Sequence, residues 1–139
     1  MPPVNNTISF NSNGGYLNSG GGIKITNCED FFIENNNINN NSADIGGGIF
    51  IDNSSGNIDY TKISYNTAID GGGLYIVESA VNIQKNIIHN NTAADEGGGV
   101  YIYSDYINLI NNTIAYNVVM CNGCSNGGGI FISNSRPNN

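Results

Sequence analysis

The chain has 139 residues, the size of a single domain, with 4 lysines and arginines against 11 aspartates and glutamates and a net charge of −7. This acidic balance excludes nucleic-acid backbones and anionic membrane surfaces as partners, because both require clustered basic side chains. No apolar run approaches the roughly 18 residues of a membrane span, so we expect no membrane insertion. The 28 asparagines and 19 glycines stand among regularly spaced isoleucine, valine, tyrosine and phenylalanine, which is typical of strands.

The first predicted element, residues 7–11, contains an Ile-x-x-Asn pattern formed by Ile8 and Asn11. The pattern returns four times, each with a small apolar residue two positions after the asparagine: Ile38, Asn41 and Ala43; Ile63, Asn66 and Ala68; Ile88, Asn91 and Ala93; and Ile114, Asn117 and Val119. A further polar residue stands two positions before each isoleucine, at Asn6, Asn36, Thr61, Asn86 and Asn112. This alternation of apolar and polar positions predicts short strands with one buried face.

The second element is a glycine triplet followed by an apolar residue, any residue and isoleucine. The triplets begin at Gly20, Gly46, Gly71, Gly97 and Gly127, so their spacings are 26, 25, 26 and 30 residues. Five copies at nearly one period identify an internal repeat. Helical repeats are excluded because each glycine inside a helix costs about 1 kcal/mol. Leucine-rich repeats are excluded because the chain has only three leucines.

The third element is an alternating pair of residues upstream of each Ile-x-x-Asn block: Phe31 and Ile33, Gly56 and Ile58, Val81 and Ile83, Ile107 and Leu109. Three short strands in each repeat predict an all-β fold, a right-handed single-stranded parallel β-helix with about five coils of about 25–26 residues. We expect one domain over residues 1–139, with a partial coil at each end and a loop insertion near residues 120–126. Equivalent isoleucines should lie in one interior column.

The glycines and asparagines have structural explanations. Glycine permits φ > 0, which the chain needs for a sharp turn before each strand. The asparagines at one repeat position are explained either as a buried stack of amides, hydrogen-bonded from coil to coil, or as residues in left-handed bends. These asparagines are Asn11, Asn41, Asn66, Asn91 and Asn117.

The five glycine triplets with their following aliphatic residue, combined with the Ile-x-x-Asn blocks, resemble the repeats of the polymorphic outer-membrane proteins. More broadly they resemble the bacterial and archaeal right-handed β-helix repeat class. The aromatic residue of that family's motif stands beside the asparagine at Phe10, Tyr65 and Tyr116. The resemblance covers nearly the whole chain and implies the fold, but this architecture hosts adhesins, structural fibres, sugar lyases and epimerases alike.

Acidic residues precede the glycine triplets at Asp44, Asp70, Asp95 and Glu96. Asp70 and Asp95 are calcium candidates because Ca²⁺ binds hard oxygen ligands. We favour solvated turn residues instead, because the Gly-Gly-x-Gly-x-Asp calcium repeat is absent. A sugar lyase would need carboxylates near basic residues. The basic residues Lys24, Lys62, Lys85 and Arg136 fall in different registers, as does the single histidine, His89. We therefore expect neither enzymatic activity nor a cofactor.

Aromatic residues occupy the outward position of the strand after each glycine triplet, at Phe50, Tyr75, Tyr101 and Phe131, with Lys24 in the first copy. This stripe has three explanations: a sugar-binding platform, a lateral protein contact, or the preference of aromatic residues for strands.

Cys121 and Cys124 fall where the period lengthens, and we expect a local disulfide between them, with Cys28 unpaired or bonded to another molecule. Glycosylation sequons occur at Asn5, Asn40, Asn53, Asn90 and Asn111.

These features predict an extracellular or cell-surface structural protein. The start of the chain lacks the pattern of a signal peptide, so the chain is either cytoplasmic or begins after processing, and we favour the second. Open strand edges are an association hazard, and we expect the partial coils to stack head to tail on other copies, forming a filament or surface fibre. The alternatives are an adhesive or glycan-binding module, a fragment of a larger surface protein, or an enzyme fragment of the lyase or epimerase type.

Overall fold

Seventeen short strands and no helix make up the part of the chain that the computed structural model describes, which is residues 6–12, 17–121 and 127–133. This part therefore offers no helical segment able to cross a bilayer. The strands in chain order are β1 (Asn6–Ser9), β2 (Ile23–Thr26), β3 (Phe31–Glu34), β4 (Asn36–Asn39), β5 (Ile49–Asp52), β6 (Ser55–Asp59), β7 (Lys62–Ser64), β8 (Thr67–Asp70), β9 (Leu74–Val77), β10 (Ala80–Gln84), β11 (Ile87–His89), β12 (Thr92–Glu96), β13 (Val100–Tyr103), β14 (Tyr106–Ile110), β15 (Thr113–Ala115), β16 (Val118–Val119) and β17 (Ile130–Ile132).

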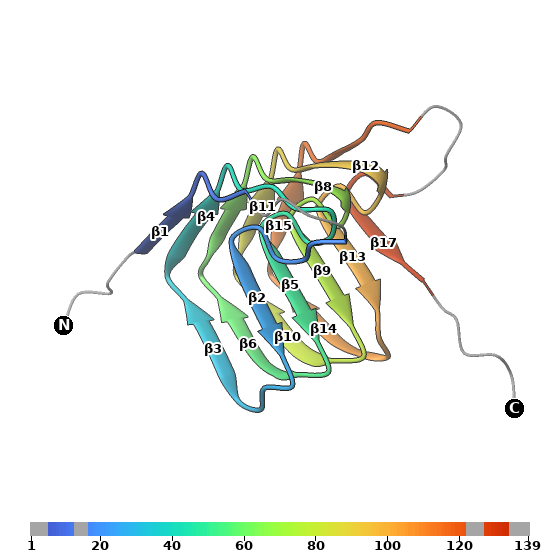
Figure 1. The fold of residues 1–139 in the computed structure, drawn as a ribbon. Coiled ribbons are helices and arrows are strands. Elements are labelled where there is room, and N and C mark those ends of the chain that lie inside the picture. The colour runs from blue at the N-terminus through green and yellow to red at the C-terminus, as the bar shows by residue number, and fades with distance from the viewer. Residues whose placement is uncertain (1–5, 13–16, 122–126, 134–139) are drawn as a thin grey trace, which may run out of the picture.

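The strands pair in parallel with their equivalents in the neighbouring coils and form four sheets. β1, β4, β7, β11 and β15 form one sheet, and β2, β5, β9, β13 and β17 form another. β3, β6, β10 and β14 form the third, and β8, β12 and β16 the fourth. Figure 1 shows the coils lying side by side around one interior, so the predicted all-β parallel solenoid of about five turns is confirmed.

The predicted number of three strands per coil is wrong, because a complete coil such as β5 to β8 contains four. The missed strand lies between the asparagine and the glycine triplet. Its copies are only two to five residues long, and each contributes a single small residue to the interior, such as Ala68 or Ala93. A segment with one inward position shows no alternation, so its period cannot be recognised in the sequence.

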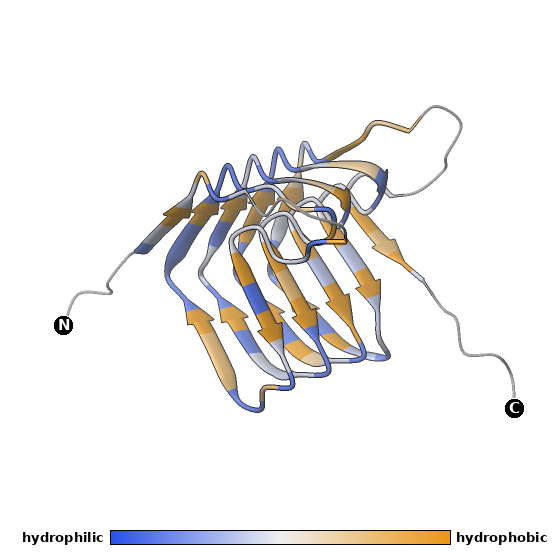
Figure 2. Ribbon diagram, viewed as in Figure 1, coloured by the Kyte–Doolittle hydropathy of each residue, from blue (hydrophilic) through white to orange (hydrophobic). Residues whose placement is uncertain are grey.

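The interior is built from columns of aliphatic side chains. Ile8, Ile38, Ile63, Ile88 and Ile114 are paired in register, which confirms the single column that the repeat predicts. The three central members are fully buried. Figure 2 shows the same alternation of apolar and polar residues at equivalent levels of successive coils. Burial of each such side chain stabilises the fold by roughly 1.5–3 kcal/mol, which one coil alone cannot achieve.

The glycine triplets have two separate structural roles. The first glycine of each triplet is in the left-handed region, as at Gly71 with φ +64, and this turn is as predicted. The second and third glycines are required for a different reason, which is the close approach of neighbouring coils. A Cβ on Gly72 would lie 2.5 Å from the Thr92 carbonyl oxygen and 2.6 Å from that of Gly98. The turn requirement thus explains only one glycine in three.

Gly56 is the one residue without a side chain in the interior column that also contains Phe31, Val81 and Ile107. The large side chain of Phe31 in the neighbouring coil explains this. A Cβ on Gly56 would lie 2.3 Å from the carbonyl oxygen of Phe31 and 2.6 Å from its ring carbon Cγ. We expect Gly56→Ala to lower the free energy of unfolding by about 1–3 kcal/mol. Adding Phe31→Val, which supplies the smaller side chain, should recover part of this loss. Urea denaturation of the four variants of this double-mutant cycle measures the coupling, and strictly additive effects would contradict the packing explanation.

Candidate functional site

The buried asparagines form a hydrogen-bonded ladder along the rod, with every polar atom of a central rung in use. Asn66 is fully buried. Its Nδ2 donates to Asn91 Oδ1 at 3.0 Å and to the Ile38 carbonyl oxygen at 3.0 Å. Its Oδ1 accepts from Asn41 Nδ2 at 3.1 Å and from the Asn41 backbone N–H at 3.0 Å. The first of the two predicted explanations, a coil-to-coil amide stack, is therefore the correct one.

The left-handed bend at this corner belongs to the preceding residue. Tyr65, for example, has φ 56 and stands directly before Asn66. The equivalent residues Phe10, Asn40, Asn90 and Tyr116 also have positive φ. The bend turns the chain at the corner, and the next side chain then points inward to continue the ladder.

The same arrangement occurs at two further corners. At the second, left-handed Asn35, Tyr60, Lys85 and Asn111 precede the polar row of Asn36, Thr61, Asn86 and Asn112. In that row the backbone N–H of Thr61 donates to Asn86 Oδ1 at 2.8 Å. At the third, the row consists of Cys28, Ser54 and Ser79, and sequence reasoning missed it. Its only signal is a small polar residue recurring at the period of the repeat. In this row the backbone N–H of Cys28 donates to Ser54 Oγ at 3.0 Å, and that of Ser54 donates to Ser79 Oγ at 3.1 Å. The polar rows therefore serve the fold.

The aromatic stripe is a ring stack on the outer face of the sheet that contains β5, β9, β13 and β17. The rings of Tyr75 and Tyr101 lie 4.3 Å apart between centroids with an interplanar angle of 5°. Phe50 stacks on Tyr75 at 5.7 Å, Phe131 tilts against Tyr101 at 5.2 Å, and Lys24 Nζ lies 5.7 Å above the Phe50 ring. The two central rings therefore cover one another's faces. Burial, and then the interaction with the Tyr101 hydroxyl, raises the pKa of Tyr75.

The basic side chains do not converge on one site. Lys85 Nζ donates to the Tyr60 hydroxyl at 2.6 Å, a contact that raises the Lys85 pKa. His89 makes an edge-on contact with Tyr65 at 5.6 Å, and burial together with Lys62 lowers its pKa. Arg136 lies outside the described residues.

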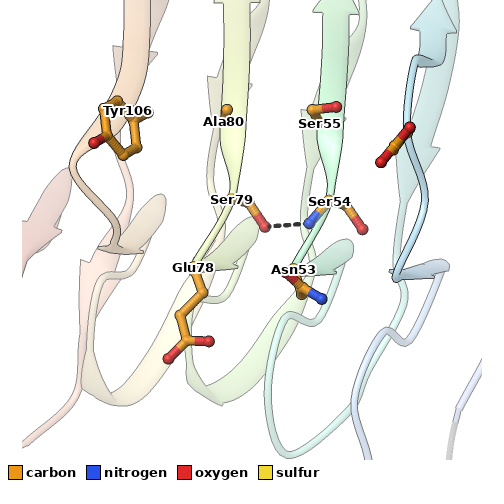
Figure 3. A pocket seen from close by; sticks show the side chains of 8 residues that line it. Asn53, Ser54, Ser55, Glu78, Ser79, Ala80 and Tyr106 are labelled. Carbon is orange, nitrogen blue, oxygen red and sulfur yellow. Dashed lines mark hydrogen bonds between the residues drawn. The ribbon is translucent and has the colours of Figure 1, made fainter.

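An open hollow of about 240 Å³ lies at the corner where β5 leads into β6 and β9 into β10 (Figure 3). Glu29, Glu78 and Tyr106 border it, and Ser55 and Ala80 lie between them. This hollow could not be predicted from the repeat, because it results from two small residues and one large residue that meet in register.

A family model described as a right-handed β-helix region matches residues 4–139. The chain belongs to this family. Neither the curated proteins nor the solved structures include a significant match. The match agrees with the parallel coils of Figure 1 and confirms the predicted fold class. Membership defines the fold of this β-helix and leaves its activity to be argued from its own residues.

The acidic residues of the β-helix meet at the glycine bends. Asp70 pairs in register with Glu96, after a register shift between Ala93 and Glu96 in the pairing of β8 with β12. Asp70 Oδ1 is buried without a hydrogen-bond partner. Asp44 Oδ2 accepts from the Asn18 backbone N–H at 2.9 Å. Within residues 6–12, 17–121 and 127–133 no three histidine, cysteine or acidic side chains gather in a group that could hold a metal ion. Calcium binding at Asp70 and Asp95 stays a prediction.

Asp70→Asn is expected to stabilise the β-helix at neutral pH, by well under about 1 kcal/mol because the carboxyl is partly solvated. Burial, and then the charges of Glu96 and Asp95, raise the pKa of Asp70 above its ordinary value of 3.8. Folding thus disfavours the ionised form. The penalty applies above the folded-state pKa and is relieved as the pH falls through it toward the ordinary value. The gain in melting temperature should therefore shrink on acidification. A gain that grows in acid would contradict this assignment.

Cys121 is disulfide-bonded and Cys28 is free. The expected partner Cys124 lies outside the described residues, so that pairing stays a prediction. Cys28 packs against the core, and its backbone N–H donates to Ser54 Oγ at 3.0 Å. Of the sequons, Asn40, Asn53 and Asn111 are exposed, Asn90 is half-buried and Asn5 lies outside the described residues. Their glycosylation also stays a prediction.

Proposed function

We propose that this β-helix is a non-catalytic structural protein of an extracellular or cell-surface assembly, and that it extends by adding copies of itself head to tail. The observation that carries the proposal is the direction of the asparagine ladder. In each step the backbone N–H and Nδ2 of one coil donate to the Oδ1 of the following coil, from Asn11 to Asn41 at one end and from Asn91 to Asn117 at the other.

The two ends of the ladder are complementary. Among the described residues, the backbone N–H of Asn117 has no acceptor and Oδ1 of Asn11 has no donor. A second copy placed head to tail supplies both groups, whereas two like ends facing each other supply neither. The apolar columns favour the same contact. Ile132 is 58% exposed, although its equivalent Ile102 in the coil below is 2% exposed. A heterologous contact of this type does not close and builds fibres.

The proposed compartment rests on the cysteine chemistry. A disulfide at Cys121 suits an oxidising environment, because cytosolic thiols are kept reduced. The sequons are compatible with the same compartment in a glycosylating host.

Electron microscopy of the purified chain tests the proposal. We expect thin filaments of uniform width at high protein concentration. Ile132→Lys should abolish them while leaving the monomer folded, because it places a charge in the contact at a position that is exposed in the monomer. Asn108→Lys, on the outer face of β14, is the matched control and should leave filaments intact. Monodisperse monomers of the parent chain at high concentration would refute the proposal.

Glycan binding by the aromatic stripe has less support, because a sugar stacks on an open ring face and Tyr75 and Tyr101 cover one another. A glycan array signal that is lost in both Tyr75→Ala and Tyr101→Ala would restore it.

A further inference from the structure

The hollow at the corner of β5, β6, β9 and β10 combines an exposed aromatic ring with two glutamate side chains. Tyr106, Ala80 and Ser55 are in register on three neighbouring strands, so one large side chain stands beside two small ones. Tyr106 is 68% exposed, and within the described chain its ring contacts no other ring. Unlike the stacked rings of the aromatic stripe, Tyr106 therefore offers a face to a ligand (Figure 3).

Three of the side-chain donors that line the hollow, those of Asn53, Ser54 and Ser79, are already in use. Asn53 Nδ2 donates to Asn27 Oδ1 at 2.7 Å. The hydroxyls of Ser54 and Ser79 donate to backbone carbonyl oxygens of their own chain segments, at 2.7 Å and 2.6 Å. A ligand rich in acceptors, such as a phosphate or a carboxylate, would find few donors here.

The acceptors, in contrast, are free. Glu29 and Glu78 border the hollow with exposed side chains, and neither carboxylate has a hydrogen-bond or ion-pair partner in the part of the chain that the structure describes. No basic residue lines the hollow. The unpartnered carboxylates, the small number of free donors and the open aromatic face favour a cation that donates hydrogen bonds, bound between Tyr106 and Glu78 on neighbouring coils.

We propose that this hollow binds the primary ammonium group of a lysine side chain, carried by an extended basic segment of a partner protein. An ammonium group has three donors and no acceptor, and it is attracted to the face of a tyrosine ring. The hollow is open and shallow, so the tip of a side chain reaches it without movement of the coils. The net charge of −7 attracts a basic segment from a distance.

Fluorescence anisotropy with a labelled peptide of alternating lysine and serine, at low ionic strength, tests the proposal. Tyr106→Ala removes the ring without changing the charge, and we expect roughly two- to fivefold weaker binding. Glu78→Gln removes one carboxylate and should weaken binding by about the same factor. Glu34→Gln is the matched control, since it changes the net charge equally at an exposed position at the end of β3, and should leave the affinity unchanged. Tyr106→Phe keeps the ring and should also bind normally.

Three outcomes would overturn the proposal. The first is equal weakening by Glu34→Gln and Glu78→Gln, which would mean that the peptide senses only the net charge. The second is unchanged binding of the peptide after acetylation of its lysines, because acetylation removes the ammonium charge. The third is binding of a glucosamine oligomer in place of the peptide, which would reassign the ammonium group to a glycan. Circular dichroism of each variant verifies that the coils remain folded.

Discussion

Asn66→Ala is expected to lower the free energy of unfolding by about 3 kcal/mol or more, because it leaves several buried polar groups without partners. The backbone N–H and Nδ2 of Asn41 both lose their acceptor. The Ile38 carbonyl oxygen loses its donor, and Asn91 Oδ1 loses one of its donors. The position is fully buried, so water replaces none of these bonds without opening the coils. Chemical denaturation followed by circular dichroism measures the loss.

Asn82→Ala is the matched control for this experiment. Asn82 also belongs to an amide row, donating to Asn57 Oδ1 at 3.0 Å and accepting from Asn108 Nδ2 at 2.7 Å. This row lies on the outer face of its sheet, where water can take over both bonds, so we expect a loss within about 0.5 kcal/mol. Similar losses at the two positions would show that burial of the amide ladder contributes nothing to its stabilising effect.

The sequence predicted the repeat and its register well, because the inward isoleucines recur at one period and side chains in stacked coils must lie over their equivalents. Ile38, Ile63 and Ile88 therefore could be placed in one column without coordinates. The asparagines could be identified as structural on the same basis. Their precise geometry could not, since an amide ladder and a left-handed bend both favour asparagine. The structure contains both, one residue apart.

The surface was harder to predict. Period and parity placed Tyr75 and Tyr101 on the outer face, but the distance and angle between their rings depend on side-chain torsions that no pattern encodes. The hollow beside Tyr106 depends on three residues from three coils. Two of them, Ala80 and Ser55, belong to no recurring sequence motif. The repeat encodes what is the same in each coil. The candidate sites arise where the coils differ from one another. Because such differences do not recur, the repeat pattern cannot predict them.

Gly73→Ala is expected to lower the free energy of unfolding by about 3 kcal/mol, the upper part of the range for overpacked interiors. The added Cβ would lie 2.4 Å from the carbonyl oxygen of Gly99 and 3.0 Å from Asn91 Nδ2. The first of these atoms belongs to the backbone of the next coil. That coil is held in place by the bond from the Leu74 N–H to the same carbonyl oxygen, at 2.9 Å. The methyl group therefore separates two coils that the ladder requires to be in contact.

Gly129→Ala makes the same change at the equivalent position of the final triplet, where the structure describes no following coil. The nearest atom to its Cβ would be Ile114 Cγ2 at 3.9 Å, which is an ordinary contact. The monomer should therefore keep its stability in thermal unfolding, in contrast to Gly73→Ala. If copies stack head to tail, the carbonyl oxygen of the next copy's glycine must approach Gly129 as that of Gly99 approaches Gly73, and Gly129→Ala should abolish filaments. A stable Gly129→Ala monomer that still forms normal filaments would show that copies do not continue the coil stacking at this end.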